Sequence, residues 1–208
     1  QNTYRLLKLV NNLIDSNKIT SGYFDFKPQS YDLIFFVESI CQSIVEFAKT
    51  KNIEVIFDTE IEEKVILFDL DKMERIILNI LSNAIKFSND GDKIEIFIKE
   101  VNDMIEIKIS DSGIGIPKDK IGCIFDRFKQ VDNHHVRKGE GSGIGLYLVK
   151  SLVDMHNGDI SVESELGKGT TFTINIPIKY ELEDDSLIII DKNIQDSHIE
   201  KIKVEFSD

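Results

Sequence analysis

Residues 71–88 read DKMERIILNILSNAIKFS and predict one long helix, because apolar residues recur with helical spacing. At about 100° per residue, Asn79, Asn83 and Lys86 lie within roughly 60° of one another on this helix. The opposite side carries an apolar stripe of Ile77, Leu81 and Ala84. Asn is a weak helix former, so two asparagines in mid-helix indicate a purpose beyond helix formation.

Two interpretations of this polar side remain open. It is either an ordinary solvated helix face or a binding surface. The second interpretation has a chemical basis, because an amide oxygen such as that of Asn83 can ligate Mg²⁺ while phosphate oxygens and water complete the coordination. Lys86, one turn further along, can neutralise phosphate charge.

A second motif, DSGIGIP at residues 111–117, directly follows a run in which apolar and polar residues alternate as in a strand. An Asp at the end of a strand can accept a hydrogen bond from an exocyclic amine such as that of adenine. Gly113 and Gly115 would permit the backbone to approach a flat ring closely. The alternative is an ordinary Asp-Ser-Gly turn without a ligand.

A third motif, GEGSGIGL at residues 139–146, opens a predicted helix. Glycines at this position expose N–H groups and the positive end of the helix dipole, which together can cradle a phosphate. The spacing excludes a P-loop, because no Gly-Lys-Ser/Thr follows the glycines, and it also excludes G-x-G-x-x-G, because the third glycine comes one residue early. A flexible loop without a ligand is the alternative.

The remaining periodicity predicts helices interleaved with strands that are mostly connected as hairpins. This order is typical of a two-layer α/β sandwich rather than a doubly wound parallel sheet. Helices are expected at residues 1–19, 32–51, 71–87 and 144–155. Strands are expected at residues 53–57, 65–68, 94–98, 104–109, 159–164 and 170–176.

The composition excludes several classes of partner. A net charge of −12 argues against nucleic acid and against direct contact with an anionic membrane, since both require a cationic face. No apolar run approaches the ~18 residues of a membrane span, and the first residues do not resemble a signal peptide. Cys41 and Cys123 have neither metal-ligand spacing nor a disulfide pattern, so we expect two reduced thiols in a cytoplasmic fragment.

The three motifs, with a Phe-containing segment between the second and third, resemble those of the Bergerat-fold ATPases, and among these the histidine kinases. The resemblance covers about residues 24–177. Asn79 and Asn83 match the Asn motif, and Phe125 and Phe128 match the Phe box. The first glycine box is matched by Asp111, Gly113 and Gly115, and the second by Gly141, Gly143 and Gly145.

The resemblance implies a Bergerat fold, with a mixed, mostly antiparallel sheet covered by three helices on one face, and an ATP site with Mg²⁺. Asp111 would recognise the adenine amine, and Asn83 would ligate the metal. Residues 129–142 would form a lid over the nucleotide. The other nucleotide-binding residues would be Asn79, Lys86, Phe87, Gly113, Gly115, Ile116, Arg137, Lys138, Gly141, Ser142, Gly143, Gly145 and Leu146.

Position 79 distinguishes activities among the proteins that this chain resembles. Relatives that hydrolyse ATP carry a Glu there, whereas this chain has Asn79, which cannot act as a general base. The resemblance therefore implies transfer of the ATP γ-phosphate to a histidine, and then to an aspartate of a response regulator receiver domain. None of His134, His135, His156 and His198 has the sequence context of the acceptor histidine, and we expect His156 to end a helix.

The same resemblance divides the chain into three parts. Residues 1–20 would be the second helix of a truncated hairpin that makes a homodimer in the parent protein and carries the acceptor on its absent first helix, so that the fragment itself would not autophosphorylate. Residues 21–178 would be the ATP-binding domain, and residues 179–208 a C-terminal appendage of unknown role. The fragment would be cytoplasmic, with any membrane anchor of the parent protein upstream.

Two other functions remain open at this point. One is a degenerate relative that binds nucleotide as a signalling or interaction module and transfers nothing. The other is a Ser/Thr kinase of the same fold that inhibits a sigma factor. The helix expected at residues 1–19 argues against the second, and the intact nucleotide motifs argue against the first.

Overall fold

The computed structural model describes residues 2–21, 25–129, 143–178, 201–202 and 204–206. Its helices are α1 (Asn2–Thr20), α2 (Leu33–Lys49), α3 (Leu70–Phe87), α4 (Lys118–Ile121) and α5 (Gly145–Met155). Its strands are β1 (Gln29–Asp32), β2 (Glu54–Thr59), β3 (Val65–Phe68), β4 (Lys93–Val101), β5 (Met104–Asp111), β6 (Asp159–Glu165) and β7 (Gly169–Pro177). The expected elements are thus present, and β1 and α4 are additional.

Five strands form one sheet in the order β2-β4-β5-β7-β6, while β1 and β3 form a separate antiparallel pair. Among the strands that the structure describes, β2 and β4 alone pair in parallel, because β3 and α3 lie between them in the chain and allow a crossover. Alternate residues of β4 and β5 point to one buried face, where Ile96 lies opposite Ile109 and Ile98 opposite Ile107. The predicted mixed, mostly antiparallel sheet is confirmed.

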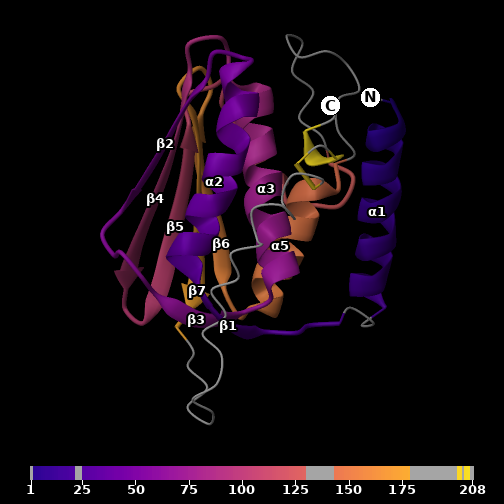
Figure 1. Cartoon of the computed structure of the whole chain (residues 1–208). Coiled ribbons are helices and arrows are strands. Elements are labelled where there is room, and N and C mark those ends of the chain that lie inside the picture. Colours follow the sequence, from indigo (N-terminus) through magenta and orange to yellow (C-terminus); the bar gives the residue numbers. More distant parts are fainter. Residues whose placement is uncertain (1, 22–24, 130–142, 179–200, 203, 207–208) are drawn as a thin grey trace.

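Helices α2, α3 and α5 cover one face of the sheet (Figure 1). Ile76, Ile77, Ile80 and Leu81 of α3 are fully buried between the sheet and the neighbouring helices. Two carboxylates cap these helices, since Asp32 accepts from backbone N–H groups at the start of α2 and Asp69 accepts from Lys72 N at the start of α3. The predicted two-layer α/β sandwich is therefore confirmed, with α3 at its centre.

His156 connects the end of α5 to the start of α3. Its Nδ1 lies 2.8 Å from the carbonyl oxygen of Leu152, and its Nε2 accepts a hydrogen bond from the backbone N–H of Asp69 at 3.2 Å. These two contacts require a neutral ring with the hydrogen on Nδ1. Burial lowers the pKa of His156, which keeps the ring neutral. The predicted helix-end role of this histidine is confirmed.

Helix α1 contacts the rest of the protein through its polar side. Asp15 is buried and pairs with Arg75 of α3, while Asn17 accepts a hydrogen bond from Arg127 at 3.0 Å. The apolar side of the helix is exposed at Leu6, Leu7, Leu9, Val10, Leu13 and Ile14. The helix predicted at residues 1–19 is confirmed, and its polar side faces the sandwich. In the described part of the chain, no helix is long and apolar enough to cross a membrane.

Candidate nucleotide-binding site

The two asparagines of α3 lie in different surroundings. Asn79 is only 6 % exposed, whereas Asn83 and Lys86 are half-buried. A solvated face does not account for Asn79, because a buried amide requires polar partners or a ligand nearby. The interpretation of this helix side as an ordinary surface is therefore wrong at Asn79.

Asn79 packs against the start of α5. A Cβ atom on Gly145, the first residue of α5, would lie 2.4 Å from Oδ1 of Asn79, so only glycine fits there without a rearrangement. The residue before it, Ile144, provides no side-chain cap for this helix end. The Asn motif and the second glycine box, 66 positions apart in the chain (145 − 79), therefore meet directly.

Asp111 stands at the end of β5, in the middle of the sheet. Burial raises the pKa of its carboxyl group to about 6, although backbone N–H groups of Gly113 and Thr170 donate hydrogen bonds that lower it. Oδ1 accepts from Gly113 N at 3.0 Å. A partly desolvated carboxylate at a strand end is suited to accept a hydrogen bond from an amine of a bound ring.

The first glycine box is held against the end of α3. The N–H group of Ile114 donates to the carbonyl oxygen of Phe87 at 3.0 Å, and a Cβ atom on Gly113 would lie 2.3 Å from the same oxygen. This contact brings the backbone beside Asp111 next to the helix that carries Asn83 and Lys86. Lys86 Nζ lies 5.4 Å from the centre of the Phe87 ring.

The other side of the first glycine box lies on the β6–β7 hairpin. Gly115 has a positive φ of 68°, and a Cβ atom there would meet the carbonyl oxygen of Glu165 at 2.1 Å. Ile116 N donates to Ser164 Oγ at 2.8 Å. Sequence reasoning missed Gly169, where an added Cβ atom would lie 1.9 Å from the carbonyl oxygen of Asp111. The glycine pair in ELGKGT, residues 165–170, was the available signal.

The Phe box meets the second glycine box at the chain positions that flank residues 130–142. Phe128 N donates to the carbonyl oxygen of Gly143 at 2.8 Å, and Gly143 has a positive φ of 65°. Phe125 packs against the core, while Phe128 is 57 % exposed. Leu146, in the first turn of α5, is half-buried. The predicted site residues Arg137, Lys138, Gly141 and Ser142 lie outside the described residues.

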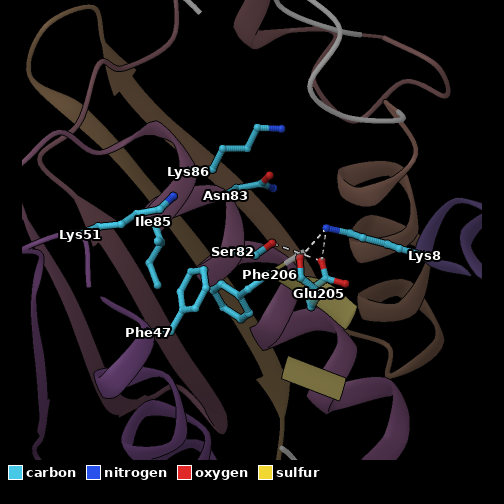
Figure 2. Close-up of a pocket in the computed structure, with 9 residues that line it drawn as sticks. All are labelled: Lys8, Phe47, Lys51, Ser82, Asn83, Ile85, Lys86, Glu205 and Phe206. Carbon is cyan, nitrogen blue, oxygen red and sulfur yellow. Dashed lines mark hydrogen bonds and ion pairs between the residues drawn. The ribbon is translucent and has the colours of Figure 1, made fainter. Parts of the chain in front are cut away.

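A cavity of about 160 Å³ adjoins the C-terminal half of α3. Figure 2 shows Asn83 and Lys86 at one side of it. Its lining residues come from α1, α2 and α3, from the turn after α2 and from the C-terminal segment, which we define as residues 201–202 and 204–206: Lys8, Phe47, Lys51, Ser82, Asn83, Ile85, Lys86, Glu205 and Phe206. Lys8 pairs with Glu205 in this lining, whereas Lys51, Lys86 and the amide of Asn83 are groups that suit an anionic ligand and its cation.

The described residues contain no group of three or more His, Cys, Asp and Glu side chains that could hold a metal ion by themselves. A single amide ligand such as Asn83 nevertheless fits Mg²⁺, because this ion usually keeps several waters and takes further oxygens from a substrate phosphate. The amide of Asn83 therefore fits a metal ion that arrives with a polyphosphate.

Comparison with known proteins agrees with this geometry. Residues 68–180, more than half of the chain, match the family described as histidine kinase-, DNA gyrase B-, and HSP90-like ATPase. Sensor histidine kinase WalK of Bacillus subtilis is 36 % identical over 185 residues, which are 88 % of this chain and 30 % of WalK. The circadian input-output histidine kinase CikA of Synechococcus elongatus is 32 % identical over 83 % of this chain and 23 % of CikA.

The chain thus spans less than a third of either relative. Among solved structures, the catalytic domain of histidine kinase ThkA superposes with a TM-score of 0.65 at 24 % identity, covering 73 % of this chain and 96 % of that one. Full-length ShkA, solved in complex with AMPPNP, superposes with a TM-score of 0.76 at 24 % identity, covering 86 % and 37 %. The chain belongs to the histidine kinase-, DNA gyrase B-, and HSP90-like ATPase family, and within it is the ATP-binding catalytic domain of a sensor histidine kinase.

Proposed function

We propose that this domain, residues 21–178, positions the γ-phosphate of ATP for transfer to a histidine rather than to water. The observation that carries the proposal is the buried amide of Asn79 against Gly145. An amide cannot remove a proton from water, so a site built around Asn79 favours an incoming nucleophile that needs no such base. Phosphoryl transfer depends chiefly on positioning and on charge neutralisation, which this site can supply.

In this proposal, the adenine lies at the first glycine box. Asp111 accepts a hydrogen bond from its exocyclic amine, and the raised pKa of this carboxyl is consistent with a site that is partly shielded from water. Gly113 and Gly115 are held by backbone contacts on two sides, so the surface beside Asp111 is formed before the ring arrives. Phe87, Ile116 and Leu146 supply apolar contacts around the base.

The triphosphate then points toward the start of α5 and toward Asn83 and Lys86. N–H groups at a helix start and the Lys86 ammonium attract phosphate oxygens. Asn83 is the protein ligand of Mg²⁺, which would supply charge neutralisation when bound. Gly143 and Gly145 let the backbone before and at the start of α5 pack closely against Phe128 and Asn79. The predicted lid residues Arg137, Lys138, Gly141 and Ser142 would complete the site.

The acceptor is a histidine on another helix of the parent protein. His156 cannot serve, because it is 4 % exposed and both of its ring nitrogens are engaged. We propose that α1 (residues 1–20) is one helix of a dimeric hairpin that presents this acceptor, and that the exposed apolar side of α1 packs in that hairpin. The site would operate in the cytoplasm.

The proposed receiver of the phosphoryl group is an aspartate of a response regulator. ThkA, of the same fold, has been solved in complex with the response regulator TrrA, and we extend that partner class to this chain as a proposal.

Calorimetric titration with ATP and ADP, with and without Mg²⁺, tests the site. We expect Asp111→Ala to abolish measurable binding and Asn83→Ala to remove chiefly the Mg²⁺ dependence. Asp119→Ala, which removes an exposed carboxylate on α4, should bind like the wild type. A folded wild-type protein that binds neither nucleotide would overturn the proposal.

Transfer is tested separately by adding a histidine-bearing hairpin of the parent protein to the chain with γ-labelled ATP. The expected product is labelled hairpin whose phosphate is lost in acid, as a phosphoramidate bond requires. Acid-stable label would indicate a hydroxyl acceptor instead. If the protein binds nucleotide but a competent hairpin acquires no label, the result would favour a degenerate relative that binds nucleotide as a signalling module and transfers no phosphate.

A further inference from the structure

The C-terminal segment occupies a groove between α1, α2 and α3. Ile202 and Phe206 are each 8 % exposed and belong to the main hydrophobic core. The Phe206 ring lies 4.9 Å from the Phe47 ring of α2, centre to centre. Figure 1 shows this segment, in yellow, between α3 and α1. Two buried apolar side chains in so short a segment indicate a specific docking contact.

Charged side chains at both ends of the segment continue this contact. Lys201 Nζ lies 3.0 Å from Asp71 Oδ1 and also pairs with the buried carboxylate of Glu74, so that the segment is tied to the first turns of α3. Burial lowers the pKa of Lys201, but these ion pairs outweigh it and raise the pKa overall. The segment therefore follows α3 toward its C-terminal half.

Glu205 ends this contact beside the proposed phosphate site. Its Oε1 accepts from Ser82 Oγ at 3.2 Å and lies 3.3 Å from Lys8 Nζ, while its backbone oxygen accepts from Lys8 Nζ at 2.7 Å. Ser82 immediately precedes Asn83. Figure 2 shows Glu205 and Phe206 on the same cavity as Asn83 and Lys86. A carboxylate thus lies on the wall of a cavity that is also lined by Asn83 and Lys86, the two residues proposed to face the polyphosphate.

We infer that the groove between α1, α2 and α3 is a docking surface for the chain's own C-terminal segment, and that the docked segment opposes nucleotide binding through the negative charge of Glu205. The inference rests on the proposed function, because it needs the phosphates next to Asn83 and Lys86. The two events oppose each other by like-charge repulsion, so each must weaken the other by the same factor. Release of the segment would therefore increase the affinity for ATP.

Two variants test the two parts of the inference, which are the negative charge of Glu205 and the docking of the C-terminal segment. Glu205→Gln removes the charge and keeps the backbone contact with Lys8, whereas Phe206→Ala removes the apolar anchor. We expect both to bind Mg–ATP about fivefold more tightly than the wild type, at the lower end of typical coupling factors because Glu205 is partly solvated. Adenosine, which carries no phosphate, should bind all three proteins equally. Glu46→Gln, which removes one charge from an exposed ion pair on α2, is the matched control and should change neither affinity.

Hydrogen exchange reports on docking without any measurement of activity. The N–H group of Phe206 donates to the carbonyl oxygen of Ile202 at 2.9 Å, so its exchange should be slow in the free protein. Saturating Mg–ATP should accelerate that exchange about fivefold, whereas adenosine should leave it unchanged.

The outcomes distinguish this inference from the proposed function. If Mg–ATP and adenosine both fail to bind, the proposed function fails. If both bind but Glu205→Gln has wild-type or weaker affinity for Mg–ATP, the site stands and the opposing role of the segment is wrong. Unchanged or slower exchange at Phe206 with bound Mg–ATP would overturn the inference equally.

Discussion

Oδ1 of Asn79 occupies the space next to Gly145, only 2.4 Å from where a Cβ atom on that glycine would lie. This relationship joins the middle of α3 to the first residue of α5. We expect Gly145→Ala to displace either the amide or the start of α5, and so to reduce both stability and nucleotide affinity, the former by about 1–3 kcal/mol. Urea unfolding and calorimetric titration measure the two effects.

The double variant Gly145→Ala with Asn79→Ala isolates this contact. Removing the amide leaves room for the new methyl group, so the stability lost in Gly145→Ala should be largely restored, while nucleotide affinity should remain low. Strictly additive losses of stability in the double variant would show that the two residues do not interact.

A second prediction concerns the stability of the nucleotide-free protein. Burial raises the pKa of Asp111 to about 6 in the folded state, so the folded protein takes up a proton that the unfolded chain, at 3.8, does not. The ionised carboxylate of Asp111 therefore destabilises the fold above pH 6, and this destabilisation decreases as the pH falls from 6 to 4. Asp111→Asn should raise the unfolding midpoint at pH 7.5 while abolishing ATP binding.

As a control, the unfolding midpoints of the wild type and Asp111→Asn are also compared at pH 4.5, where the variant should be stabilised by a smaller amount. A variant that is less stable than the wild type at pH 7.5 would mean that the carboxylate is needed for folding rather than for binding.

A third prediction is that adenosine binding weakens in acid. Protonation of Asp111 removes the carboxylate that would accept the hydrogen bond from the amine. Affinity should therefore be constant above pH 7 and fall by up to about tenfold per unit below the pKa of about 6. Adenosine is the ligand of choice because ATP phosphates titrate in the same range. Chemical-shift titrations from pH 8 to 5 would measure it, and a flat profile would contradict the role given to Asp111.

A fourth prediction concerns His156. Replacing it with Ala leaves the N–H group of Asp69 without its acceptor and creates a cavity, so we expect a loss of about 2–4 kcal/mol in the free energy of unfolding. Because burial lowers the pKa of His156, the unfolded chain binds the proton more tightly. The stability that the neutral ring provides should be complete above pH 6.5 and decrease as the pH falls below it.

The difference in the free energy of unfolding between the wild type and His156→Ala measures this decrease, since the titration of Asp111 affects both proteins alike. The difference should narrow between pH 7.5 and 5.5. A difference that widens in acid would mean that the charged ring is favoured in the fold.

Much of the fold follows from local pattern. The period-two alternation of β4 and β5 and the apolar stripe of α3 predicted these elements to within a few residues, because one buried face imposes that spacing. The strand β1 and the helix α4 were missed. Each has only four residues, too few for a period, and β1 exists because it pairs with β3, more than 30 positions away.

Those site residues were predictable whose type is required by the conformation or chemistry of a short stretch of sequence. Asp111, Gly113 and Gly115 were identified from a short motif, and the structure brings them to the end of α3. The burial of Asn79 and the contact of Gly169 with Asp111 depend on residues distant in sequence, so the glycine pair in ELGKGT marks a turn but not the residue that Gly169 contacts. The same is true of the C-terminal segment, whose place depends on Phe47 and Lys8.

The polar attachment of α1 has a mechanical consequence. Asp15–Arg75, Asn17–Arg127 and Lys8–Glu205 are the polar contacts that attach this side of the helix. Ile19, near the end of the helix, adds an apolar contact with the core, while the exposed apolar residues of α1 lie on its other side. Because the Asp15–Arg75 and Lys8–Glu205 pairs are largely shielded from solvent, salt screens them little, and α1 stays attached at physiological ionic strength. A partner seated on Leu6 and Leu13 would therefore bind the free apolar side of a helix whose polar side is already fixed.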